Sequence, residues 1–117
     1  MATISKQLLS GSTQGKGIKV TGTSTGAAVT VHTAVSGTTD IDEIWLWCAN
    51  QHSGAVELTI EWGGTAVDDL IVVDVTEDAG LVQIAPGIPL QNGLVIKAFA
   101  NSANVVNIFG FVNRLDI

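Results

Sequence analysis

The sequence has little of what most metal, redox and catalytic sites require. Cys48 is the only cysteine among 117 residues, so no disulfide can form within the chain. Tyrosine is absent, and the only histidines, His32 and His52, have no neighbour at metal-ligand spacing. We therefore interpret Cys48 as a small buried hydrophobe, and the histidines as ordinary strand and loop residues. We expect no metal and no cofactor.

Charge is also scarce and unevenly distributed. Charged residues make up only 14% of the chain, against roughly 25% in a typical soluble domain, and the net charge is −6. An acidic chain lacks the cations that nucleic-acid binding requires, so we expect no nucleic-acid partner. Residues 1–39 contain Lys6, Lys16 and Lys19 but no carboxylate, whereas all eleven acids lie in residues 40–117. This asymmetry indicates either a basic arm that meets an acidic surface, or a solvated segment with unremarkable lysines.

Long hydrophobic runs are missing as well. The N-terminal segment lacks the apolar core of a signal peptide, and no stretch approaches the roughly 20 apolar residues of a membrane span. We therefore expect no Sec-dependent export and no membrane partner.

What the sequence does contain is a repeated β pattern. Apolar and polar residues alternate in short segments that Gly, Asp, Asn and Ser separate; the segments are 18–21, 29–35, 44–49, 56–62, 70–75, 81–84, 94–100 and 105–112. About eight short strands predict an all-β fold, an antiparallel β-sandwich of jelly-roll-like class, in residues 17–117. The flexible, polar residues 1–16 are predicted to form an extended N-terminal arm. A strict immunoglobulin domain would need two cysteines, whereas this chain has one, so we prefer the jelly-roll class.

The last 25 residues carry the strongest strand pattern. Two apolar segments, 94–100 and 105–112, flank a small polar turn at 101–104, which predicts an antiparallel hairpin. The second segment is apolar on both faces, with Phe109 and Phe111 on one of them. We expect it to lie centrally in a sheet or against another subunit.

The segments that resemble catalytic or ligand-binding motifs lack the spacing or the surroundings that those motifs require. Residues 11–17 resemble a phosphate-binding loop, but the glycine spacing is one residue short and no hydroxyl residue follows Lys16. Glu57 and Glu61 share the polar face of one strand and are interpreted as solvated rather than as a glycosidase pair. The acids 68, 69, 74, 77 and 78 lack EF-hand spacing and indicate a solvated acidic edge. We predict that the protein is not an enzyme.

Tryptophan provides the most informative side chains. Trp45 and Trp47 share one face of a strand whose other face carries Ile44 and Leu46. We interpret this strand as a core strand that is covered on both faces; an interface, where Trp is enriched, is the alternative, and carbohydrate stacking is a third. The candidate interface residues are Lys6, Lys16, Lys19, Trp45, Trp47, Trp62, Phe109 and Phe111.

The sequence as a whole resembles a group of small structural proteins of tailed bacteriophages. The resemblance rests on the phrases ISKQLLSGSTQGKGIKV, DEIWLWCAN, ELTIEWGG, DDLIVVDV and GLVIKAFANSANVVNIFGFVNR, and it runs through nearly the whole chain. These proteins are similar to capsid decoration, or cement, proteins. The resemblance implies a β-sandwich on the outer capsid surface, assembled in the host cytoplasm. It also implies a homo-oligomer, with a trimer favoured by capsid geometry, whose partner is the major capsid protein. A tail, neck or fibre protein, or a carbohydrate-binding module, is the alternative.

Overall fold

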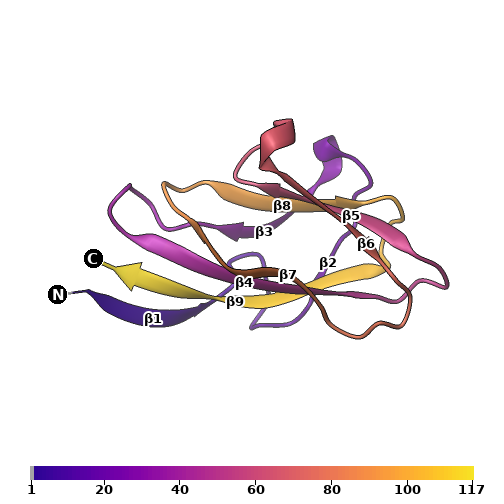
Figure 1. Cartoon of the computed structure of the whole chain (residues 1–117), viewed down its shortest axis with the longest axis horizontal. Coiled ribbons are helices and arrows are strands. Elements are labelled where there is room, and N and C mark those ends of the chain that lie inside the picture. Colours follow the sequence, from indigo (N-terminus) through magenta and orange to yellow (C-terminus); the bar gives the residue numbers. More distant parts are fainter. Residues whose placement is uncertain (1) are drawn as a thin grey trace.

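The computed structural model describes residues 2–117, so Met1 lies outside the description. These residues form nine β-strands and two single-turn 3-10 helices (Figure 1). The strands are β1 (Thr3–Leu8), β2 (Ile18–Lys19), β3 (Val29–Thr33), β4 (Ile41–Asn50), β5 (Val56–Trp62), β6 (Leu70–Val75), β7 (Val82–Leu90), β8 (Val95–Ala100) and β9 (Val106–Asp116). The 3-10 helices are η1 (Thr25–Ala27) and η2 (Val67–Asp69).

The strands form two antiparallel sheets that pack face to face. The five-stranded sheet has the order β1-β9-β4-β7, with β2 paired to β9, and the four-stranded sheet has the order β3-β8-β5-β6. Every strand pair is antiparallel. The predicted all-β antiparallel sandwich is therefore confirmed.

The core lies between the sheets because each strand turns alternate side chains inward. In β4 the residues at even positions are all buried, including Ile44, Leu46 and Cys48, whereas the residues at odd positions are half-buried. Val56, Leu58 and Ile60 of β5 face them from the other sheet and have no exposed surface.

The predicted hairpin of the last two strands is wrong. β8 pairs with β3 and β5 in the four-stranded sheet, whereas β9 pairs with β1, β2 and β4 in the other sheet. The five residues 101–105 therefore carry the chain from one layer to the other. The central position expected for the last strand is confirmed, because β9 lies between β1 and β4.

The predicted N-terminal arm is not confirmed. Thr3–Leu8 forms β1, which pairs with β9 from Thr3↔Asp116 to Leu8↔Phe111 and is the edge strand of the sheet. β1 is the one strand that was not predicted. Its side chains are exposed or half-buried on both faces, so its sequence lacks the apolar–polar alternation of a strand with one buried face. The predicted segment 81–84 is too short. β7 continues through Pro86 and Gly87 to Leu90, and two register shifts against β4 accommodate these two residues.

Candidate functional site

Four aromatic side chains gather on the outer face of the five-stranded sheet. Because even positions of β4 and β9 point into the core, odd positions point outward, and Trp45, Trp47, Phe109 and Phe111 all occupy odd positions. The strand register places Phe111 opposite Trp45 and Phe109 opposite Trp47. All four side chains are half-buried. We call them the aromatic face.

Three of these rings are nearly parallel. The Trp45 ring centre lies 6.1 Å from that of Phe111 and 6.4 Å from that of Trp47, with interplanar angles of 7° and 18°. The Trp47 and Phe111 centres are also 6.1 Å apart, at 24°. Offset, near-parallel aromatic rings at this spacing attract one another beyond the area that they bury. The three rings therefore form one ordered apolar patch.

Two glycines leave room for the outer rings. A Cβ atom on Gly87 of β7 would come within 2.9 Å of the Trp45 ring, so the indole lies across that glycine. A Cβ on Gly17 would likewise come within 2.8 Å of the Phe109 ring. The aromatic face thus extends sideways over the neighbouring backbone on both sides.

Polar groups fix the edge of the patch. The indole Nε1 of Trp45 donates a hydrogen bond to Glu43 Oε1 at 2.8 Å, and Asn113 Nδ2 donates to the same oxygen at 3.1 Å. These hydrogen bonds, that of Trp45 foremost, lower the pKa of Glu43. Lys6 Nζ lies 4.6 Å from the centre of the Phe111 ring, which is a cation–π contact.

The structure brings together most of the predicted interface residues. Lys19 pairs with Asn107, an outward position of β9, so it lies on the same face as Lys6, while Lys16 is exposed in the loop before β2. Trp62 is separate: it ends β5 in the other sheet, and its Nε1 lies 3.4 Å from the Pro89 carbonyl oxygen as a hydrogen-bond donor.

The interpretation of Trp45 and Trp47 as residues of a doubly covered core strand is wrong. Within residues 2–117, no third layer covers the outer face of the five-stranded sheet. β4 is central, as its sequence indicates, but only its even positions face a second sheet. The wide indole surfaces are instead half-covered by one another and by Phe111.

Sequence reasoning missed several residues of this face. Ile4 and Leu8 of β1 lie opposite Leu115 and Phe111, and they are 70% and 57% exposed. Glu43 and Asn113 lie opposite each other beside Trp45. The alternation of β4 places Glu43 on the face of Trp45, but only the pairing of β1 with β9 brings Ile4 and Leu8 there.

A buried polar network joins the two sheets at one end of the sandwich. His32 of β3 and Asp42 of β4 are 1% and 0% exposed, and His32 Nε2 lies 2.8 Å from Asp42 Oδ2. His32 Nδ1 accepts a hydrogen bond from the Ser10 backbone N–H at 3.0 Å. A neutral ring with its proton on Nε2 fits both contacts. His32 therefore links the two sheets through Asp42, and its ring is too deeply buried to contact a substrate.

Asp42 is the centre of this network. Burial alone would raise the pKa of its carboxyl group, but hydrogen bonds from Arg114 and His32 outweigh burial and lower it. The Val35 backbone N–H donates a further bond to Oδ2 at 3.0 Å. The residues resemble part of a catalytic triad, but no serine hydroxyl contacts His32, and both titratable groups have their hydrogen bonds satisfied within the protein.

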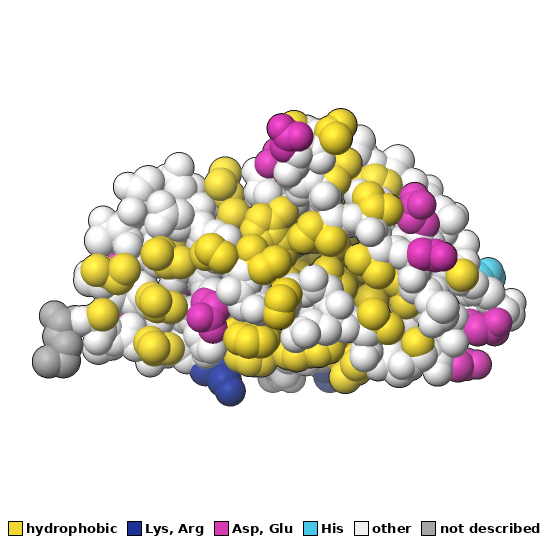
Figure 2. Space-filling model, viewed as in Figure 1, with side chains coloured by type: hydrophobic (Ala, Val, Ile, Leu, Met, Phe, Trp, Pro, Cys, Tyr) yellow, Lys and Arg dark blue, Asp and Glu magenta, His cyan; other side chains and the backbone are white. Residues whose placement is uncertain are grey.

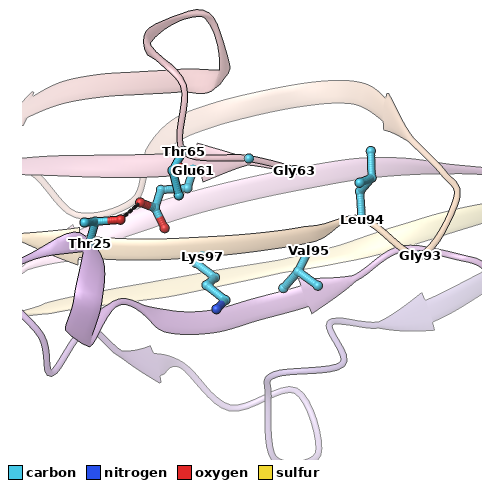
Figure 3. Close-up of a pocket in the computed structure, with 9 residues that line it drawn as sticks. Thr25, Glu61, Gly63, Thr65, Gly93, Leu94, Val95 and Lys97 are labelled. Atoms are coloured by element: carbon cyan, nitrogen blue, oxygen red, sulfur yellow. Dashed lines mark hydrogen bonds between the residues drawn. The ribbon is translucent and has the colours of Figure 1, made fainter.

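An open cavity of about 340 Å³ lies on the four-stranded sheet (Figure 3). Thr25 of η1 donates a hydrogen bond to the buried carboxylate of Glu61, and Lys97 and Val95 of β8 lie beside them. Most of the lining is apolar, and the hydroxyl of Thr25 and the carboxylate of Glu61 are already bonded to each other. The prediction that Glu57 and Glu61 are both solvated is therefore wrong for Glu61, which is buried, and correct for Glu57, which is exposed.

The remaining reactive groups do not form a site. Among residues 2–117, no group of three or more His, Cys, Asp or Glu side chains is placed to hold a metal ion. Cys48 is fully buried, and burial raises the pKa of its thiol to about 11. The described helices include none that is long and apolar enough to span a membrane.

Comparison with protein-family models, with curated proteins and with solved structures finds no match for this chain.

Proposed function

We propose that this protein is a virion structural protein of a tailed bacteriophage, and that it decorates the outer surface of the capsid. It binds the major capsid protein through the aromatic face and stabilises the shell by non-covalent contacts. The observation that supports this proposal most is the ordered patch of Trp45, Trp47 and Phe111, held by Glu43 and Lys6 on a sheet face that no described layer covers.

The composition of the aromatic face is that of a binding surface. Aromatic side chains are enriched at the centres of protein interfaces, because they bury a large area while losing little conformational entropy. Here they are already ordered by stacking, so binding costs little further entropy. Lys6 and Lys19 flank the rings, and Glu43 is the nearest carboxylate. A partner surface with apolar pockets and an acidic rim complements this face.

The strand order supports a jelly roll as the finer class of the fold. From β3 onward the chain alternates between the two sheets, except at the β5–β6 hairpin, and each sheet holds four main strands. Two Greek keys folded together produce this alternation, and capsid proteins are among the proteins that use the class. The proposal is consistent with that class and does not depend on it.

The experiment is a binding assay between the purified protein and empty heads that lack the decoration protein. Trp47→Ala is expected to weaken binding by about 30-fold, since truncation of a central aromatic anchor costs about 2 kcal/mol or more. Trp62→Ala is the matched control, because it removes the same side chain from the other sheet. Equal binding by Trp47→Ala and the unchanged protein would contradict the role of the aromatic face.

Location on the particle is tested separately. A decoration protein is present in hundreds of copies and a neck ring in about a dozen, so the copy number per particle distinguishes a head from a neck position. Labelling confined to the tail would overturn the proposal for the head and leave the alternative of a tail, neck or fibre protein.

A carbohydrate-binding module is the second candidate, and one observation favours it. The near-parallel rings of Trp45, Trp47 and Phe111 lie on an open sheet face, with Asn113 and Glu43 beside them as hydrogen-bonding groups. Sugar rings can stack on such a platform. Binding to a glycan array that Trp47→Ala abolishes, together with no binding to heads, would favour this candidate.

A further inference from the structure

The edge of the sandwich formed by β6 and β7 leaves part of the core open. Ile71 and Val73 of β6 and Ile84 and Ile88 of β7 pack against the core but remain half-buried. In Figure 2, apolar side chains fill the middle of the face that shows this edge. A cavity of about 190 Å³ lies there, between η2, β6 and Ile88 of β7. This surface is unlike the closed core elsewhere between the sheets.

β6 is also an unprotected strand edge. It pairs with β5 in unbroken register from Val56↔Val75 to Glu61↔Leu70, and no described strand lies on its other side. It contains no proline, and its side chains are β-branched or apolar except for Asp74. β7, by contrast, carries Pro86, Pro89 and two register shifts, which hinder the pairing of a further strand. Exposed apolar edges such as β6 are normally paired or covered.

The rim of this edge is acidic. Asp68 and Asp69 precede β6, Asp74 lies within it, and Glu77 and Asp78 follow it. Residues 62–96 contain no lysine or arginine. In Figure 2 acidic side chains lie above and to the right of the apolar middle. A partner that covers the edge must therefore present both apolar and cationic groups.

The opposite edge of the same molecule has that composition. β1 is the other end of the five-stranded sheet, and its side chains include the exposed Ile4 and Leu8 with Lys6 between them. Lys16 and Lys19 follow in the loop and in β2, and residues 2–39 contain no carboxylate. We propose that the β6–β7 edge of one copy binds the β1–β2 edge of a second copy, so that the chains associate head to tail.

The charges favour this arrangement over a twofold dimer. Two β6 strands paired about a twofold axis would bring two acidic rims together, and like charges at an interface repel each other. Head-to-tail contact instead joins opposite charges and uses a different surface on each partner, so it generates a ring or an open chain. This inference goes beyond the proposed function, which does not depend on it. The head-to-tail contact engages Ile4, Lys6 and Leu8 at the β1 side of the aromatic face, whereas Trp45 and Trp47 lie on β4, on the far side of β9.

The test is the mass of the purified protein in solution, measured over a range of concentrations and salt, without heads. The unchanged protein is expected to associate, and to associate less at high salt. Lys16→Glu with Lys19→Glu, and separately Asp74→Lys with Glu77→Lys, are each expected to weaken association about tenfold or more. A mixture of the two double variants restores it, because the basic edges of one variant then meet the acidic edges of the other. Lys97→Glu, which changes an exposed lysine in the middle of the four-stranded sheet, is the control.

Two outcomes would overturn the inference. One is a protein that stays monomeric at every concentration and salt. The other is undiminished association of the Lys16→Glu, Lys19→Glu variant, which would indicate contact through another surface, including a twofold β6 contact. If the reversed acidic edge prevents folding, the neutral pair Asp74→Asn with Glu77→Gln replaces it, with a smaller loss expected. Loss of head binding by Trp47→Ala with normal association would separate this inference from the proposed function.

Discussion

The guanidinium of Arg114 holds the buried carboxylate of Asp42 by two hydrogen bonds. Nε donates to Oδ1 at 2.7 Å and Nη2 donates to Oδ2 at 3.0 Å. The two residues are direct cross-strand partners of β4 and β9, and β9 is the last strand of the chain. The pair therefore attaches the C-terminal strand to the centre of the sheet at the end where His32 connects the second sheet.

The Asp42 network makes folding stability depend on acid. Because the pKa of Asp42 is lowered in the folded state, its contribution is fully present above the unfolded pKa of about 3.8 and is lost as the pH falls through the lower folded value. Asp42→Asn is expected to cost about 3 kcal/mol of unfolding free energy at pH 7, because it leaves His32 and Arg114 without a charged partner. Urea unfolding between pH 2 and 7 measures both effects.

The network is tested by the difference in unfolding free energy between the unchanged protein and Asp42→Asn. This difference is expected to be constant from pH 7 to about 5 and to shrink below pH 4. Asp116→Asn, at the exposed end of β9, is the control and should change stability little at any pH. A difference that grows on acidification would contradict the lowered pKa.

The sandwich was predictable from the sequence because its main strands bury one face and alternate accordingly. β4 shows that alternation, which is independent of which strand lies beside which. The sequence of β5 alternates as well, but its polar positions Thr59 and Glu61 are also buried. The pairing of β8 and β9 was not predictable in this way. Each of them has an inward apolar face, and a core side chain is buried equally well whether its strand joins one sheet or the other.

The aromatic face was predictable only in part. The alternation in β4 places Trp45 and Trp47 together, but their contact with Phe111 depends on the register between β4 and β9. β1 gave no signal because both of its faces are exposed, so Lys6 was a candidate on charge alone. His32 and Asp42 are ten residues apart on strands of different sheets, and no local pattern indicates that they meet.

The tautomer of His32 is a second testable feature. Since the Ser10 N–H donates to Nδ1, the ring proton is expected on Nε2, facing Asp42. Nitrogen-15 chemical shifts of the imidazole, recorded at neutral pH, distinguish the two tautomers. His52, exposed in the loop after β4, is the internal reference and should not show this fixed state. A proton on Nδ1 of His32 would contradict the proposed bond to Ser10.

Gly87 supports the aromatic face. It has φ +80° and lies beneath the Trp45 ring, so alanine there is expected to cost about 1 kcal/mol for the backbone and more for the displaced indole. Gly80 has φ +70°, and a Cβ atom at that position would have no neighbour within 4 Å, so Gly80→Ala measures the backbone cost alone. Unfolding free energies and tryptophan fluorescence give the comparison. Equal losses for the two variants would show that Trp45 is not held by the glycine.

Cys48 reports on the opening of the core. Its side chain is fully buried in β4 and the pKa of its thiol is raised to about 11, so a disulfide reagent is expected to modify it about 10³-fold more slowly than a free cysteine. A raised folded pKa means that stability is fully present below the ordinary value of 9.0 and declines as the pH rises toward 11, since only the unfolded thiol then ionises. The stability advantage over Cys48→Ala should therefore shrink above pH 9. Rapid modification at neutral pH in the absence of urea would mean that the sheets separate far more readily than the closed core indicates.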